Sequence, residues 1–367
     1  MSKIDDLLEI EPFSLAPNKK EKIFMEAVRE SLVFHYNNCE NFRKFCKKRG
    51  FNPYGKYGLT EVPFLPVEIF KTVKLISVKE ENISKNVFSS STSGNIPSSI
   101  FLDDVTSKRQ RKSLNKIVSS FIGPERKIFI IFDAEKTITS KDGKLSSRAA
   151  AIRGMLPFMK KAFFILDENL ELDRNSLRMA VNSVGKSERV CFLGFTFLFY
   201  ETMKKNANKK DVVNLFKKIS GSYVLHLGGW KRLQNLKIEK LEFNSDLSLF
   251  LHTKPKKVID VYGMTEQLGT IYLDCEYGYK HVPVYSDIII RDIKTLKPAK
   301  DGNSGLIQLI SPLPNSYPGV SIISDDIGVI VNKDGCKCGR KGKFFLFRNR
   351  AEKAELKGCG DTLRNGL

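Results

Sequence analysis

Residues 258–270 read VIDVYGMTEQLGT and join a strand signal to a polar loop. Its first four residues, 258–261, are mostly β-branched and apolar, which is typical of a buried strand. A Tyr-Gly pair ends the strand, and Thr265 and Glu266 follow at once. In open parallel α/β sheets, ligands bind outside the carboxyl ends of the strands. Because a Thr hydroxyl can bind a phosphate oxygen and a Glu carboxylate can bind Mg²⁺, the stretch indicates a phosphate site.

Three other short apolar runs predict further strands of the same sheet. They are residues 127–133 (KIFIIFD), 189–196 (RVCFLGFT) and 222–227 (SYVLHL). Helix-like stretches, residues 198–206 and 211–219, fall between them. Continuous apolar strands that alternate with helices predict a largely parallel α/β sheet covered on both faces.

The two ends of the chain have different sequence patterns from the middle. Residues 19–49 carry apolar side chains at helical spacing, which predicts one or two amphipathic helices. Residues 62–71 (VPFLPVEIFK) contain two prolines and predict a packed, extended connector. Shorter strands with Gly, Pro, Asn and Asp turns are expected at residues 286–291, 305–311 and 326–332. We therefore expect an α/β core with an N-terminal helical segment over residues 1–275, a β-rich subdomain that closes the site over 276–350, and a mobile C-terminal tail over 351–367.

The composition is that of a folded protein. The 367 residues are 41% hydrophobic and 28% charged, with a net charge of +20. No run of about 18 apolar residues predicts a transmembrane helix, and the acidic N-terminus is unlike a signal peptide, so we expect a cytosolic protein. Lysine-rich clusters are scattered along the chain. This favours a solvated surface that attracts anionic substrates over a face that binds nucleic acid.

The cysteine pattern predicts reduced thiols. Seven cysteines, an odd number, follow no secretion signal. Cys336 and Cys338 form a C-x-C pair, but a zinc site usually needs four ligands with a recognisable second pair. Only Cys359 or a distant His could complete such a site, so we interpret the segment as a tight, glycine-rich turn.

A serine-rich loop lies between apolar segments. Residues 88–99 read FSSSTSGNIPSS. Such a loop can present hydroxyl and backbone N–H groups to a polyphosphate as an anion-binding nest. A flexible linker is the alternative, but a linker is usually longer and flanked by low-complexity sequence. The pattern favours a tight turn between ordered elements.

The order of these motifs resembles the adenylate-forming enzymes. A Ser/Thr/Gly loop, YGMTE at residues 262–266, an Asp in SDDIG and then an Arg follow one another as they do in that group. Within it, the chain is most similar to the acyl-protein synthetases (LuxE type) of bacterial fatty-acid reductase complexes, over nearly its whole length. The similarity includes PFLPVEIFK, HLGGW at 226–230, CKCGRKG and the late KGC at 357–359. The resemblance implies an acyl-CoA synthetase-like N-terminal fold, with parallel sheets flanked by helices and a smaller β-rich subdomain, and no full C-terminal ligase domain.

The resemblance also implies residue roles. The phosphate-binding loop would comprise Ser90, Ser91, Thr92, Ser93 and Gly94. Thr265 would contact the α-phosphate and Glu266 would bind Mg²⁺. Asp326 would bind the ribose hydroxyls, and Arg350 would meet the ribose or a phosphate. The adenine and acyl pocket would be lined by His226, Gly228, Gly229 and Trp230, with Tyr262 and Gly263 beside the adenine.

The implied reaction is ATP- and Mg²⁺-dependent activation of a long-chain fatty acid as an acyl-adenylate. The acyl group would pass to Cys359 as a thioester and then to a partner such as an acyl reductase or acyl carrier. Lys353 and Lys357 lie close in sequence, and a nearby cation raises the thiolate fraction. Two alternatives stay open. The first is a related ligase that transfers the acyl group to CoA, a carrier protein or a sugar amine in surface-polysaccharide or secondary-metabolite biosynthesis, with Cys359 incidental. The second is a basic module that binds nucleic acid or an anionic surface.

Overall fold

The computed structural model describes residues 2–89, 97–139, 144–185, 188–229 and 238–351. The chain divides into two compact units. Unit 1 takes in residues 1–117, 263–272 and 279–367, and unit 2 takes in residues 118–262 and 273–278. The first boundary falls within a helix, and the second falls directly after the strand that opens YGMTE. The expected division into residues 1–275, 276–350 and 351–367 stays a prediction.

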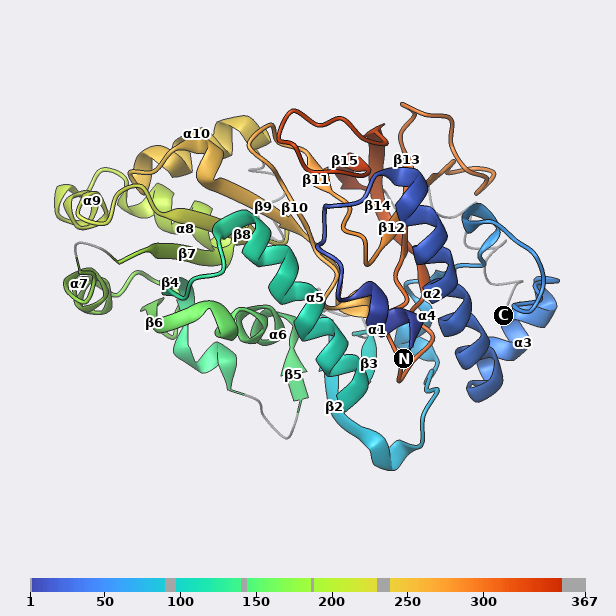
Figure 1. Cartoon of the computed structure of the whole chain (residues 1–367). Helices are drawn as coiled ribbons and strands as arrows, with labels where there is room; N and C mark the ends of the chain where they lie inside the picture. Colours follow the sequence, from blue (N-terminus) through green and yellow to red (C-terminus); the bar gives the residue numbers. More distant parts are fainter. Residues whose placement is uncertain (1, 90–96, 140–143, 186–187, 230–237, 352–367) are drawn as a thin grey trace. The chain divides into compact units, whose positions relative to one another are not determined.

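Unit 2 is built on a parallel sheet, whose described strands run in the order β9-β8-β7-β4-β6 (Figure 1). Its strands are β4 (Lys127–Ala134), β6 (Met159–Leu166), β7 (Val190–Phe195), β8 (Tyr223–Leu227) and β9 (Val258–Tyr262), with β10 (Tyr272–Leu273) beside β9 and the short β5 (Lys144–Ser146) apart from them. β4 and β7 are buried along their whole length, as continuous apolar strands in a covered sheet should be. The predicted parallel α/β fold is confirmed.

Helices cover this sheet and share an aromatic core with it. They are α6 (Ser147–Gly154), α7 (Arg174–Asn182), α8 (Thr196–Asn206), α9 (Lys210–Lys217) and α10 (Lys240–Phe250). α8 packs on β4, β7 and β8, α10 on β9, and α7 on β6. Phe132, Phe192 and Phe216 meet in the core with ring centroids 5.8 to 6.1 Å apart. Such aromatic packing adds to the burial energy that holds helices on a sheet.

A buried carboxylate lies near the carboxyl end of β4. The side chain of Asp133 is fully buried. It accepts hydrogen bonds from the backbone N–H of Ala134 (2.8 Å), the hydroxyl of Thr137 (2.6 Å) and Nε of Arg148 (3.0 Å). Because its oxygens are satisfied within unit 2, this carboxylate has a structural role.

Unit 1 combines N-terminal helices with a β-rich part. Its helices are α1 (Lys3–Leu7), α2 (Pro17–Asn38), α3 (Glu40–Lys48), α4 (Ile69–Thr72) and α5 (Asp104–Ile122), the last of which contains the unit boundary. α2 and α3 confirm the helices predicted over residues 19–49. The connector over residues 62–71 was predicted to be extended throughout, which is wrong at its end. α4 forms there because no proline follows Pro66, and Ile69 and Phe70 are buried.

The β-rich part of unit 1 is mainly antiparallel, with the order β11-β15-β14-β13-β12 and β1 parallel to β14. Its strands are β1 (Leu65–Pro66), β11 (Lys280–His281), β12 (Asp287–Arg291), β13 (Gly305–Ile310), β14 (Ser321–Asn332) and β15 (Phe344–Arg350). The three strands predicted here are confirmed, although β14 begins earlier than expected. Among the described helices of both units, none combines the length and apolar character that crossing a bilayer requires.

A second strand pair in unit 1 flanks the serine-rich loop. β2 (Ile83–Phe88) and β3 (Ser99–Asp103) pair antiparallel, with Phe88 opposite Ser99. The prediction that ordered elements border this loop is therefore confirmed. Residues 90–96 lie outside the described part of the chain.

Candidate active site

The turn after β9 is anchored by a buried glutamine. Residues Thr265–Gln267 form a 3₁₀ turn, η7, in unit 1. Nε2 of Gln267 donates to the carbonyl oxygens of Gly319 (2.8 Å) and Leu309 (3.2 Å). Because both carbonyls belong to the β13 and β14 region, these bonds fix the turn to the β-rich sheet.

Glu266 is held from its backbone as well. The hydroxyl of Tyr317 donates to the carbonyl oxygen of Glu266 over 2.9 Å. A Cβ atom on Gly319 would lie 2.3 Å from Cε2 of Tyr317 and 3.2 Å from that same carbonyl oxygen. A side chain at position 319 would therefore push this contact apart, so the close approach requires glycine.

The carboxyl group of Glu266 is buried, and its surroundings act on its pKa in opposite directions. The residue is 4% exposed. Burial raises the pKa of Glu266, while the Ser98 hydroxyl and the positive charges of Lys71 and Arg350 act to lower it. The raised pKa means that these neighbours do not fully compensate the buried charge. A bound cation would supply the missing compensation.

Asp326 and Arg350 are cross-strand partners at the end of the β14–β15 ladder. Nε of Arg350 lies 3.5 Å from Oδ1 of Asp326, and the backbone N–H of Ala351 donates to the carbonyl oxygen of Asp325 over 2.7 Å. The Arg350 side chain is 74% exposed, whereas that of Asp326 is 16% exposed. An exposed guanidinium keeps most of its five donors available for a phosphate or ribose oxygen.

Two charged residues near Arg350, Asp325 and Lys71, were not predicted from the sequence. Burial raises the pKa of Asp325, and Glu68 and Asp326 act in the same direction, while Arg350 and Lys71 oppose them. Lys71 thus acts on both Asp325 and Glu266. The signals were present, because SDDIG contains two aspartates and Lys71 ends the PFLPVEIFK stretch.

Unit 2 holds the predicted residues around the end of β8. His226 is buried, and its Nδ1 lies 3.0 Å from the hydroxyl oxygen of Thr196 at the start of α8. The same hydroxyl lies 2.8 Å from the carbonyl oxygen of Gly228. Gly228 has φ +69°, and a Cβ atom there would lie 3.0 Å from Cδ1 of Phe195, so this position requires glycine.

The predicted site residues therefore fall into three sets. Unit 1 contains Gly263, Thr265, Glu266, Asp326 and Arg350. Unit 2 contains His226, Gly228, Gly229 and Tyr262. The remainder, Ser90, Ser91, Thr92, Ser93, Gly94, Trp230 and Cys359, lie outside the described residues. Within unit 1, the positive charge of Arg350 acts on the carboxylates of Glu266, Asp325 and Asp326.

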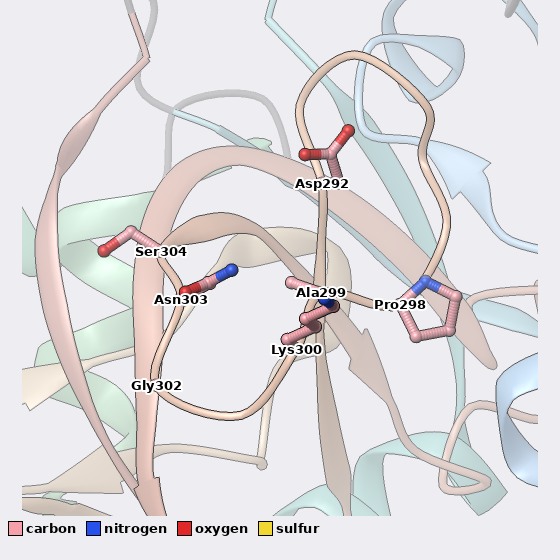
Figure 2. A pocket seen from close by; sticks show the side chains of 7 residues that line it. All are labelled: Asp292, Pro298, Ala299, Lys300, Gly302, Asn303 and Ser304. Atoms are coloured by element: carbon pink, nitrogen blue, oxygen red, sulfur yellow. The ribbon is translucent and has the colours of Figure 1, made fainter.

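A surface hollow of about 540 Å³ lies at the β12–β13 connection, away from these residues in sequence (Figure 2). It is lined by Asp292, Pro298, Ala299, Lys300, Gly302, Asn303 and Ser304. The carboxylate of Asp292 accepts from the backbone N–H groups of Lys294 (3.1 Å) and Thr295 (2.8 Å). That carboxylate holds its own turn, and the lining of the hollow includes none of the predicted site residues.

The fold is that of the adenylate-forming ligases. The open conformation of 2-hydroxyisobutyryl-CoA ligase, solved in complex with 2-HIB-AMP and CoA, matches with a TM-score of 0.68 at 12% identity, over 90% of this chain and 74% of that chain. The postadenylation state of the same ligase with R3-HIB-AMP matches with a TM-score of 0.69 at 12% identity, over 93% and 69%. At such identities the likeness shows the fold alone, and it confirms the predicted fold class.

The family follows from the sequence. The family model described as acyl-protein synthetase, LuxE, matches residues 1–367, and the chain belongs to this family. A long-chain-fatty-acid–luciferin-component ligase of Aliivibrio fischeri is 26% identical over 337 residues, which are 90% of this chain and 85% of the relative. The protein of the same name from Vibrio harveyi is 23% identical over 363 residues, which are 98% and 92%. The predicted family is confirmed.

Proposed function

We propose that the protein uses ATP to activate a long-chain fatty acid as an acyl-adenylate and then carries the acyl group as a thioester on Cys359. Membership of the acyl-protein synthetase family over residues 1–367 is the observation that carries this proposal. The names of the two relatives, both long-chain-fatty-acid ligases, support the choice of acid.

The first step joins the carboxylate to the α-phosphate. A carboxylate oxygen attacks the α-phosphorus, the bond from that phosphorus to the bridging oxygen breaks, and pyrophosphate leaves. Thr265 donates to the α-phosphate and Arg350 to the ribose or a phosphate, while Asp326 accepts from the ribose hydroxyls. Donors positioned at the phosphates stabilise the charge that develops there.

The carboxylates of unit 1 fit a magnesium ion. Burial raises the pKa of both Glu266 and Asp325, so each gains stabilisation from an added cation. Carboxylate oxygens are the ligands that Mg²⁺ prefers, and Glu266 would hold it. When bound, Mg²⁺ supplies charge neutralisation at the phosphates.

The second step moves the acyl group to sulfur. The Cys359 thiolate attacks the acyl carbonyl carbon, the bond to the phosphate oxygen breaks, AMP leaves, and the thiol proton passes to solvent. Between Arg350 and Cys359 a fully extended chain would span at most about 30 Å, so the linking segment is long enough to bring the thiol to a nucleotide held by Arg350. The thioester then passes the acyl group to a partner protein such as an acyl reductase or acyl carrier.

The remaining predicted roles belong to the same proposal. The phosphate loop comprises Ser90, Ser91, Thr92, Ser93 and Gly94, and the adenine and acyl pocket is lined by His226, Gly228, Gly229, Trp230, Tyr262 and Gly263. The glycine that the fold requires at position 228 supports a close approach of backbone at the end of β8.

Covalent labelling tests the proposal. The full chain is incubated with labelled long-chain fatty acid, ATP and Mg²⁺, then denatured. We expect label that stays on the protein and is released by hydroxylamine, that is lost in Cys359→Ser and that persists in Cys39→Ser. Cys39 is a suitable control because it precedes α3 at the N-cap position, where serine is favoured.

Two outcomes would redirect the proposal. Full covalent label in Cys359→Ser would show that this thiol is not the acceptor. Absence of covalent label, with the acyl group appearing on added CoA, carrier protein or amine, would favour the related ligases instead.

A further inference from the structure

The C-x-C pair lies in the hairpin loop that joins β14 to β15. Cys336 and Cys338 belong to this loop, and His281 ends β11 beside it. β11 lies beside β15 (Figure 1) and pairs with it antiparallel. In this register His281 is opposite Phe344, the first residue after the loop. The strand register therefore brings a histidine from far upstream to the two thiols.

The three side chains are close enough to share one ion. Nε2 of His281 lies 3.2 Å from Sγ of Cys338. The potential ligand atoms of His281, Cys336 and Cys338 all lie within 4.8 Å of one another. Zinc–sulfur and zinc–nitrogen bonds of about 2.3 and 2.0 Å at tetrahedral angles separate the ligand atoms by roughly 3.5–3.8 Å. Movements of about 1 Å or less would complete the geometry.

The environment is that of a closed, buried site. His281 is fully buried and Cys336 is 8% exposed. Nδ1 of His281 is buried and has no hydrogen-bond partner among the described residues. Buried ring nitrogens normally have a hydrogen-bond or metal partner, so Nδ1 of this imidazole lacks an interaction that such atoms usually make.

Two glycines shape the loop around the thiols. Gly335 and Gly339 both have φ +83°, and the backbone N–H of Gly339 donates to the carbonyl oxygen of Cys336 over 3.0 Å. The tight, glycine-rich turn expected from the sequence is confirmed. The sequence left a metal site dependent on Cys359 or a distant histidine, and His281 is a distant histidine that lies beside the two thiols.

We infer that His281, Cys336 and Cys338 bind a structural zinc ion. Thiolates and imidazoles are the common ligands of structural zinc, and soft sulfur ligands favour zinc over the hard cations that bind ATP.

The ion would tie β11 to the loop end of the β14–β15 hairpin. The opposite end of that hairpin carries Asp326 and Arg350. Zinc binding therefore stabilises the strands that position this pair, and it does so whether or not the proposed acyl transfer is correct.

Metal content tests the inference directly. The full chain, without an affinity tag, is loaded with zinc, passed through gel filtration and measured by inductively coupled plasma mass spectrometry. We expect about one zinc per chain. His281→Ala, Cys336→Ser and Cys338→Ser should each lose most of it, whereas Cys39→Ser should keep it. Substoichiometric zinc in the wild type, or full zinc in Cys338→Ser, would overturn the inference.

Cobalt provides a readout that does not depend on the folding of the variants. Co²⁺ bound by thiolates in a tetrahedral site absorbs through sulfur-to-cobalt charge transfer and intense visible d–d bands. We expect both in the cobalt-loaded wild type, and a lower melting temperature after chelation. An octahedral cobalt spectrum without charge transfer, or a melting temperature unchanged by complete metal removal, would refute a structural thiolate site.

Discussion

Replacing Arg350 with alanine separates a catalytic role from a structural one. The side chain is 74% exposed, and its ion pair with Asp326 spans 3.5 Å. Exposed ion pairs contribute about 0–1 kcal/mol, so Arg350→Ala should lower the free energy of unfolding by less than about 1 kcal/mol. Urea denaturation followed by circular dichroism measures this quantity.

The same change should have a much larger effect on adenylate formation. Removing a donor that faces developing charge typically lowers the rate about 10²- to 10³-fold, which corresponds to about 2.7–4 kcal/mol of transition-state stabilisation. Fatty-acid-dependent exchange of radiolabelled pyrophosphate into ATP measures it. Arg348→Ala is the matched control, because Arg348 is exposed on the same strand and the change in net charge is identical.

The comparison of the two variants can refute the reasoning. If Arg350→Ala exchanges pyrophosphate within about twofold of Arg348→Ala, Arg350 does not stabilise the reaction. If Arg350→Ala instead loses about 3 kcal/mol or more of unfolding free energy, its loss of activity would have a structural cause.

Three further changes test other parts of the account. Burial raises the pKa of Glu266 above its ordinary 4.5, so the folded state holds this proton to higher pH than the unfolded chain, and its ionisation at neutral pH costs stability. Glu266→Gln should therefore be at least as stable as the wild type in urea at pH 7, and the difference should vanish below pH 4.5. The variant should nevertheless be inactive in pyrophosphate exchange. A variant less stable than the wild type at pH 7 would contradict this. Asp133→Ala leaves the Arg148 guanidinium without its carboxylate and should lower the unfolding free energy by about 3 kcal/mol, whereas a loss under about 1 kcal/mol would be too small for a buried pair. Cys359→Ser should retain pyrophosphate exchange and lose only the thioester, and equal loss of both would mean that the two steps are wrongly divided.

Four strands of the sheet in unit 2 were predictable because their signal is local. β4, β7, β8 and β9 are short apolar runs separated by helical patterns, and burial on both faces of a parallel sheet demands that pattern. α4 was missed because the two prolines before it favour an extended backbone. Their effect ends before Ile69, where the helix begins. The early start of β14 was missed for a related reason, since nearby prolines and glycine suggested a turn.

The candidate site was less predictable because tertiary pairing assembles it. The resemblance pointed to Glu266, Asp326 and Arg350, but nothing local indicated the parallel pairing of β1 with β14 that brings the segment carrying Lys71 to this sheet. β1 is only two residues long, too short for a periodic pattern. The C-x-C pair was visible in the sequence, whereas the histidine beside it depends on the register of β11 on β15.

Acid-dependent ATP–pyrophosphate exchange tests whether the protein activates carboxylates. A panel of carboxylic acids of increasing chain length is offered to the wild type and to Glu266→Ala with ATP and Mg²⁺. We expect exchange by the wild type with long-chain fatty acids and none by Glu266→Ala. No exchange by the wild type with any acid, or undiminished exchange by Glu266→Ala, would contradict it.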